Sequence, residues 1–471
     1  MNFDNSYAAL PQGFHATVSP DEVSAPSLLG WNQALALELG LDSLDSDEVR
    51  LARVFSGADA LEGSQPISMA YAGHQFGHFV PQLGDGRAAL LGEVVTGAGT
   101  RFDIQLKGSG RTPFSRGGDG KSWLGPVLRE YILSEAMHNL GVPTTRALAA
   151  VATGETVYRE TPMPGAVFTR VAASHLRVGT FEFFAARKDV ELLKTLADYA
   201  IDRHYPEAKE EKSPYVGLFR RVMERQAELI AHWMSIGFIH GVMNTDNTAI
   251  SGETIDYGPA AYMDEFRFDK VFSSIDTHGR YAYANQPTIA QWNLARFAET
   301  LLALGAGKDE LEAVLAMFPD QYECRYLALM GPKLGLHDVE PADAGLIAEW
   351  LKYLNDNGLD YTLSFRELAS RVDALDETRF GAFETRWRQR TGSQGTTPAE
   401  VSALMNSVNP LFIPRNHFVE QAISEAVDGN LTVFNEMNTA LAQPYTEQPG
   451  LSDYAKAPRP NERVTRTFCG T

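Results

Sequence analysis

Cysteine is nearly absent from the chain. Cys324 and Cys469 are the two cysteines among 471 residues, and they form no Cys-x-x-Cys pair. Two isolated cysteines support neither a disulfide framework nor a zinc-thiolate site. Long apolar runs are missing too, since no stretch approaches the roughly 18 apolar residues of a membrane span. The N-terminus shows no basic region followed by an apolar run, so we expect a cytoplasmic protein without a membrane contact.

Basic residues are few relative to acidic ones. The chain has 41 Lys and Arg against 60 Asp and Glu, which gives a formal net charge of −19. A surface of this sign repels nucleic acids and anionic membranes, so neither is expected as a general partner. A small anionic ligand is not excluded, because one pocket can be locally basic.

The chain has enough apolar material for more than one core. Hydrophobic residues make up 44% and aromatic residues 10%, and 471 residues exceed the size of a single typical core. Short strands mix with helices up to about residue 285, and helical periodicity dominates afterwards. We therefore expect an α+β fold. Its regions would be 1–70, 71–165, 166–285 and 286–471, the last being a mainly helical domain.

Turn residues and periodicity predict individual elements. Residues 82–94 are interpreted as a hairpin around Asp85-Gly86, because Gly tolerates a positive φ. Residues 101–107 alternate strictly and place Lys107 on the face opposite Ile104. Helices are expected at 122–140, 190–205, 217–236 and 343–357, a strand at 167–171 and a solvated loop at 207–212. Thr288 is expected to cap a helix that ends at Gly305, and Pro319 to break the next helical pattern.

A polar loop follows the apolar residues 236–239. It contains Asp246 and Asn247, and Asp256 comes nine residues later in an Asp-Tyr-Gly segment. Asn and Asp oxygens are hard ligands, so Asn247 and Asp256 are candidate ligands of Mg²⁺ or Mn²⁺, and Asp246 can accept a proton from a hydroxyl. An Asx-rich turn is the plainer alternative. The order and spacing nevertheless match the way protein-kinase-like folds hold a metal nucleotide.

The loop departs from the kinase pattern at one position. Kinases carry an Asp two residues after the His of this loop, whereas here Val242 follows His240 at that spacing. We therefore expect a two-lobed kinase-like fold that binds ATP and a metal without the ordinary γ-phosphate transfer.

Lys107 and Glu130 form a second candidate pair. A Lys at the end of a strand and a Glu on the next helix can meet, and the Glu then orients the ammonium toward nucleotide phosphates. The pattern is common by chance and gains meaning from the metal-binding loop downstream.

Two glycine-rich segments can approach a nucleotide closely. Gly84, Gly86 and Arg87 offer a turn and a forked donor, although an ordinary turn with a surface Arg is favoured by the local sequence. The later segment is not a Walker A loop, because Ser115 replaces the required Gly. Asp119 and Gly120 stay candidates, since backbone N–H groups before a helix can bind phosphate.

Two further pairs are ambiguous. Arg170 and Arg177 bracket a polar turn and can either hold phosphates bidentately or be surface charges. His74 and His78 are four residues apart, but Gln75 stands where a metalloprotease needs Glu, so both are expected to be core or loop histidines.

Four segments together resemble the SelO (selenoprotein O, YdiU) family: residues 71–77, 105–113, 240–247 and 256–259. The resemblance covers nearly the whole chain. It implies a kinase-like fold that binds ATP in a flipped orientation and transfers AMP to Ser, Thr or Tyr hydroxyls of proteins. UMP transfer from UTP with Mn²⁺ is also attributed to bacterial members.

The resemblance also implies roles for single residues. The nucleotide-binding set would be Gly84, Gly86, Arg87, Lys107, Asp119, Gly120, Arg170 and Arg177, with Glu130 as the partner of Lys107, Asn247 and Asp256 as metal ligands and Asp246 as proton acceptor. In many members a cysteine after the Asp-Tyr-Gly-Pro segment is implied to pair with a Cys or selenocysteine near the C-terminus. Residues 260–281 contain no cysteine, so this redox control is not expected, and Cys324 is expected to be a buried core residue.

Three functions stay open at this point: a protein adenylyltransferase, an atypical kinase that releases ADP, and a catalytically inactive ATP-binding scaffold. Val242 counts against the kinase. The presence of Lys107, Asp246, Asn247 and Asp256 counts against the inactive scaffold.

Overall fold

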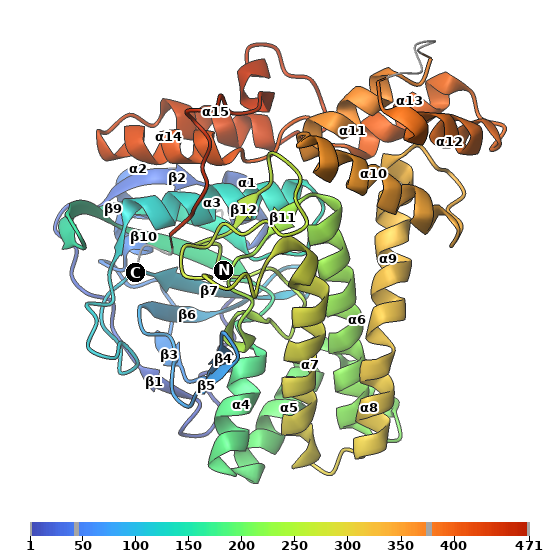
Figure 1. Cartoon of the computed structure of the whole chain (residues 1–471). Coiled ribbons are helices and arrows are strands. Elements are labelled where there is room, and N and C mark those ends of the chain that lie inside the picture. Colours follow the sequence, from blue (N-terminus) through green and yellow to red (C-terminus); the bar gives the residue numbers. More distant parts are fainter. Residues whose placement is uncertain (1, 42–46, 374–378, 469–471) are drawn as a thin grey trace.

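An antiparallel sheet of eight strands forms one side of the protein (Figure 1). The computed structural model describes residues 2–41, 47–373 and 379–468, so Cys469 lies outside the described residues. Seven strands follow the order β1-β3-β6-β7-β10-β9-β2, and β8 pairs with β10. The strands are β1 (His15–Thr17), β2 (Ser27–Trp31), β3 (Ile67–Met69), β6 (Ala88–Val95), β7 (Arg101–Lys107), β8 (Ser122–Trp123), β9 (Arg146–Tyr158) and β10 (Pro162–Ala172).

Strand β7 divides its side chains between the two faces of the sheet. Ile104 and Leu106 are fully buried in a core shared with helices α1 (Gln33–Glu38) and α2 (Glu48–Ser56). The period of two therefore turns Lys107 to the opposite face, where helix α3 (Leu124–Asn139) lies. The alternation predicted for residues 101–107 is confirmed.

Helices make up most of the chain after the sheet (Figure 1). Beside the sheet stand α4 (Val178–Arg187), α5 (Val190–His204), α6 (Pro214–Ser235), α7 (Gln286–Leu302), α8 (Lys308–Ala316) and α9 (Phe318–Lys333). A helical group follows with α10 (Asp343–Asn357), α11 (Tyr361–Ser370), α12 (Gly381–Gly392) and α13 (Pro398–Val408), and then α14 (Asn416–Val427) and α15 (Thr432–Leu441), which pack on α3. The fold is thus mixed α and β with a helical C-terminal part, as predicted.

Short elements lie between these parts. Two small antiparallel sheets of two strands are formed by β4 (Gly73–Gln75) with β5 (His78–Val80), and by β11 (Phe238–Ile239) with β12 (Ala261–Tyr262). The 3₁₀ helices are η1 (Pro206–Glu210), η2 (Thr245–Asn247), η3 (Tyr283–Asn285) and η4 (Ser452–Ala455). No helix of the described residues is long and apolar enough to cross a membrane.

The hairpin predicted at residues 82–94 is wrong. Strand β6 begins at Ala88 and pairs with β7 across the turn that follows Val95. The Asp85-Gly86 pair makes no hairpin, because the carboxylate of Asp85 is buried and accepts from the N–H of Met69 at 3.1 Å. A tertiary contact has outweighed the local turn preference.

Other sequence predictions are corrected at single residues. Helix α7 begins at Gln286, so Thr288 lies inside it and does not cap it. The break expected at Pro319 is confirmed, by contrast, because α8 ends at Ala316 and Pro319 lies in the first turn of the next helix, α9, where Pro is tolerated. Cys324 is exposed and is not a core residue. Residues 206–210 form η1 in place of the predicted loop.

Residues 1–70, which the sequence sets apart, contribute β1, β2 and β3 to the sheet. The domain boundaries expected at residues 70, 165 and 285 stay predictions.

Candidate active site

Four side chains from four parts of the chain meet on the α3 face of the sheet. Lys107 ends β7, and its ammonium donates to the carboxylate of Glu130 on α3 and to Asp256 Oδ1 at 2.5 Å. Arg170 lies on the neighbouring strand β10 and donates from Nη1 to the same Asp256 Oδ1 at 2.8 Å. The contact between Lys107 and Glu130 expected from the sequence is present, and both basic groups converge on Asp256.

Asp256 is held in an uncommon backbone conformation. Its φ is 65°, in the left-handed region that non-Gly residues seldom adopt. Burial alone would raise the pKa of its carboxyl, but Lys107 and Arg170 outweigh burial and hold the pKa well below the ordinary value. Asp256 is therefore an ionised oxygen donor at neutral pH.

Asp246 stands in a different environment. It lies in η2 and is 8% exposed, and its Oδ2 accepts from Gln75 Nε2 at 3.2 Å. Its Oδ1 is buried and has no hydrogen-bond partner in the part of the chain that the structure describes. Burial raises the pKa of Asp246 to about 6. A carboxylate that titrates near neutral pH and has a free oxygen suits a proton acceptor.

Asn247 is oriented by the loop backbone. Its side-chain Nδ2 donates to the carbonyl of Val242 at 3.0 Å, which leaves the side-chain oxygen to act as a donor atom for a cation. An amide oxygen and an ionised carboxylate are hard donors and fit Mg²⁺, which usually keeps water and phosphate oxygens as its other ligands. The described residues contain no group of three or more His, Cys, Asp or Glu placed to hold a metal. No contact among the described residues joins Asn247 to Asp256, so their role as common ligands of one metal ion stays a prediction.

Arg177 links the two acidic positions. It is buried just before α4, and its Nη1 donates to the backbone carbonyl of Asp246 at 3.2 Å and lies 3.9 Å from Asp256 Oδ2. Burial would lower the pKa of its guanidinium, but neighbouring Tyr71 and Asp85 outweigh burial and raise it. Its Nη2 is buried without a hydrogen-bond partner within the described ranges, so this cation has a donor to offer an anion.

A chain of buried hydrogen bonds orients Arg170. Arg170 donates from Nε to His175 Nε2 at 3.2 Å, and His175 Nδ1 is 2.9 Å from Asp103 Oδ2. A guanidinium only donates, so Nε2 is the acceptor and Nδ1 carries the proton. Burial lowers the pKa of His175 to about 4, which keeps the ring neutral. Gln105 accepts from the other end of Arg170 at 2.7 Å.

The glycine-rich loops make their described contacts outside the group of side chains around Asp256. The described hydrogen bonds and ion pairs of Gly84, Gly86, Arg87, Asp119 and Gly120 do not include Asp246 or Asp256. Asp119 pairs with Arg159 at 2.8 Å. A side chain at Gly84 would collide with the Phe114 ring at 2.4 Å, and one at Gly120 with the carbonyl of Gly110 at 2.0 Å. Packing thus accounts for both glycines, and a contact of these loops with a nucleotide stays a prediction.

Three residues that contact the candidate site are not predicted from the sequence: Gln75, Tyr71 and Asp85. Gln75 hydrogen-bonds Asp246, the Tyr71 ring lies 4.4 Å from the Arg177 guanidinium carbon, and Asp85 lies 4.0 Å from Arg177. The segment 71–77 stands out from the sequence only through the family resemblance, and the local sequence around Asp85 predicts a turn. No local signal marks these residues, because their partners lie far away in the chain.

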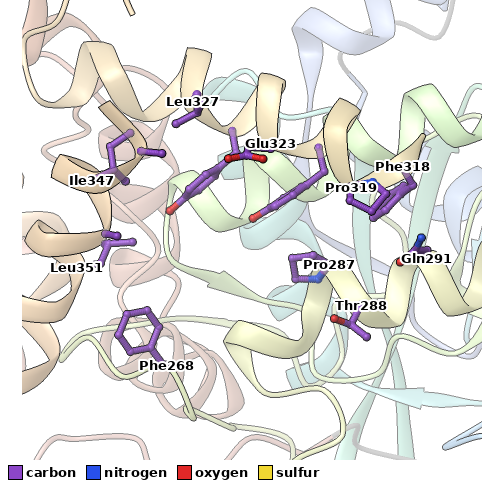
Figure 2. Close-up of a pocket in the computed structure, with 14 residues that line it drawn as sticks. Phe268, Pro287, Thr288, Gln291, Phe318, Pro319, Glu323, Leu327, Ile347 and Leu351 are labelled. Carbon is purple, nitrogen blue, oxygen red and sulfur yellow. The ribbon is translucent and has the colours of Figure 1, made fainter. Parts of the chain in front are cut away.

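A groove of about 490 Å³ lies elsewhere, between α7, α9 and α10 (Figure 2). Its walls are mainly apolar and aromatic, with Phe268, Phe318, Leu327 and Ile347 among them. It contains none of the candidate residues, so its chemistry does not bear on the site around Asp256.

Comparison with known proteins agrees with the motifs. The family model described as protein adenylyltransferase SelO matches residues 1–442. The protein nucleotidyltransferase YdiU of Agrobacterium fabrum (strain C58) is 56% identical over 486 residues, covering 100% of both chains. The proteins of the same name from Rhizobium leguminosarum bv. trifolii (strain WSM2304) and Bradyrhizobium diazoefficiens (strain USDA 110) are 55% and 53% identical over 100% of this chain and 97% and 99% of their own. With similarity of this extent, the chain belongs to the SelO family of protein adenylyltransferases.

Proposed function

We propose that this chain transfers AMP from ATP to Ser, Thr or Tyr hydroxyls of proteins and releases pyrophosphate. The observation that carries the proposal is the convergence of Lys107 and Arg170 on Asp256, while Arg177 joins Asp256 to Asp246. A cationic group of this kind suits a triphosphate. We further propose that the sheet and the helices beside it correspond to the two lobes of a kinase-like fold.

Each candidate residue has its own role in the proposed reaction. Asn247 and Asp256 would hold Mg²⁺ or Mn²⁺, which when bound neutralises phosphate charge. Lys107, Arg170 and Arg177 donate to phosphate oxygens, and Glu130 keeps the Lys107 ammonium in position. Asp246 takes the proton from the acceptor hydroxyl, the hydroxyl oxygen bonds to the α-phosphorus, and the bond to the leaving pyrophosphate breaks.

Val242 supports nucleotidyl transfer over the kinase alternative. Its side chain is apolar and buried, and its carbonyl is used to orient Asn247. The position that carries the kinase base therefore offers no proton acceptor here. UTP as a second donor substrate and a cytoplasmic location stay predictions.

The test is label transfer from α-labelled and γ-labelled ATP, in parallel, onto the protein itself and onto cell-lysate proteins. We expect labelling from the α-label alone, and Asp256→Ala to lower it on the order of 10³-fold, because the metal–phosphate contact is lost. Asp269→Ala is a matched control, since the Asp269 side chain is 79% exposed.

Each alternative has its own signature in this experiment. Labelling from the γ-label alone would mean an atypical kinase. Tight ATP binding without any labelling would mean an inactive scaffold. Full activity of Asp256→Ala would remove the metal-ligand assignment.

A further inference from the structure

Arg280 is a cation without an acidic partner. Its guanidinium forms no ion pair within 4.0 Å among the described residues, and its Nε is buried without a hydrogen-bond partner. The nearby carboxylate of Asp276 already accepts from the backbone N–H groups of Arg280 and Tyr281, at 2.9 and 2.8 Å. In a chain of net charge −19, an arginine without a carboxylate partner is suited to bind an anionic group of another molecule.

An aromatic ring holds Arg280 in place. Its guanidinium lies 4.9 Å from the centre of the Trp292 ring and 5.8 Å from that of Tyr281. Arg296 approaches Trp292 as well, at 5.0 Å, but is paired with Glu299 at 2.7 Å. Stacking on a ring face fixes the plane of the Arg280 guanidinium and does not itself use the N–H donors at its edge.

The β4–β5 hairpin connects Arg280 to the candidate proton acceptor. A Cβ at Gly77 would lie 3.5 Å from the Arg280 guanidinium carbon, and the Phe76 ring is 5.0 Å from that of Tyr281. Two residues earlier, Gln75 hydrogen-bonds Asp246. Arg280 and the Asp246 carboxylate thus lie at the two ends of one short segment.

The same hairpin presents apolar surface beside Arg280. Phe79 is 39% exposed, and the His74 ring lies between the rings of Phe79 and Trp292, at 5.0 and 5.3 Å. We call Phe76, Phe79, His74, Trp292 and Arg280 the Arg280 platform. It combines ring faces with one cation, next to the place where an acceptor hydroxyl must arrive.

We propose that the Arg280 platform binds an acidic side chain of the protein acceptor, close to the hydroxyl that is modified. This inference rests on the proposed function. Acceptor and nucleotide need different cations: Arg170 and Arg177 lie within 4.0 Å of Asp256, whereas no described contact joins Arg280 to Asp256. Since the enzyme as a whole repels acidic segments, a local cation lets such a segment approach Asp246.

The test uses a synthetic peptide library with one central Ser, Thr or Tyr and mixed residues on both sides. The full-length protein, Arg280→Gln and Arg296→Gln label it with α-labelled ATP, and the labelled peptides are sequenced by mass spectrometry. ATP affinity is measured for each protein by titration. Arg296→Gln is the matched control, because Arg296 contacts the same ring but is already paired.

We expect the wild type and Arg296→Gln to select Asp and Glu beside the hydroxyl. In Arg280→Gln this selection should disappear, with about a tenfold higher KM for an acidic peptide and unchanged ATP affinity, because one charge-assisted hydrogen-bonded pair is lost. Arg280→Lys should restore part of the selection.

Three outcomes would overturn the inference. Labelled peptides without acidic residues in excess would refute it and leave the proposed function standing. Weaker ATP binding by Arg280→Gln would assign this arginine to the nucleotide. No labelling of any peptide, protein or lysate by the wild type would refute the proposed function itself.

Discussion

Gly73 shows how closely single residues are packed around the candidate proton acceptor. A Cβ at this position would lie 2.6 Å from Asp246 Oδ1 and 2.9 Å from its Cβ. We expect Gly73→Ala to displace the Asp246 carboxylate and lower AMP transfer about tenfold or more, since small displacements of a reacting group are costly. Label transfer at saturating ATP measures this loss.

The control for this substitution is Gly345→Ala. Gly345 lies exposed on α10, with no atom within 4 Å of an added Cβ. Ala in a helix is favoured over Gly by roughly 0.5–1 kcal/mol, so this variant should keep full activity and gain slightly in stability. Equal activity of the two variants would show that Gly73 does not limit the position of Asp246.

Single residues were predictable from the sequence where one element carries the signal. Lys107 follows from strict alternation in one strand, and Glu130 from its place on the next helix. Gln75 and Asp85 were not predictable as site residues, because their partners lie far away in the chain: Gln75 reaches Asp246, and Asp85 reaches Gln105 at 3.1 Å. Such pairs form only when the chain folds.

At the scale of elements, too, a prediction succeeds where its signal is local and fails where a distant contact competes. The helix predicted at 343–357 agrees with α10, whose periodic apolar residues and terminal Gly358 are local features. The hairpin at 82–94 failed because Asp85 is engaged by the β3 backbone. Local preference is decisive only where no distant partner competes for the same groups.

Glu253 joins the end of β10 to the turn that precedes Asp256. Its carboxylate accepts from the N–H of Ala173 at 3.0 Å and from the hydroxyl of Ser251 at 2.8 Å. Burial raises the pKa of Glu253 from 4.5 to about 7. Between these pH values the folded state binds a proton that the unfolded state lacks, so the free energy of unfolding falls as the pH rises from 4.5 to 7.

We therefore expect Glu253→Gln to remove this pH dependence and to stabilise the protein at pH 8 by about 1–3 kcal/mol. Urea unfolding at several pH values measures the effect. Glu160→Gln, a change of an exposed residue, serves as control and should leave the pH dependence as it is. An unchanged slope in Glu253→Gln would show that Glu253 is ionised throughout.

At the scale of the whole molecule, Arg415 ties the helical C-terminal part to the chain that follows the candidate site. It is fully buried, and its Nη1 donates to Asp264 at 2.8 Å and to Asp360 at 2.6 Å. Arg415→Met would leave both carboxylates without their cation, and we expect a loss of about 3–5 kcal/mol in the free energy of unfolding. Denaturant titration measures the loss.

The matched control is Arg463→Met. Arg463 pairs with Glu265 at 2.6 Å, but its side chain is 48% exposed. Exposed pairs contribute about 0–1 kcal/mol, so this variant should unfold nearly as the wild type does. A loss of the same size in both variants would mean that burial of Arg415 adds nothing.

The mixture of helices and strands and the helical C-terminal part were predictable from the sequence. The packing of the last helices against an early helix beside the sheet was not. Helices α14 and α15 pack on α3, and Arg129 of α3 pairs with Glu420 of α14. These helices are almost three hundred residues apart from α3, and their apolar stripes fit many partners. Periodicity shows which face of a helix is buried, but it does not show which other element packs against that face.

Strand β7 restricts how this chain can vary between species. Asp103, Gln105 and Lys107 point to one side of the sheet and Ile104 and Leu106 to the other. An exchange of one apolar residue for another leaves this division intact. Insertion or deletion of one residue would turn every later side chain over, bringing Lys107 into the apolar core and an aliphatic residue to Asp256. We expect relatives to differ here by substitution and never by length.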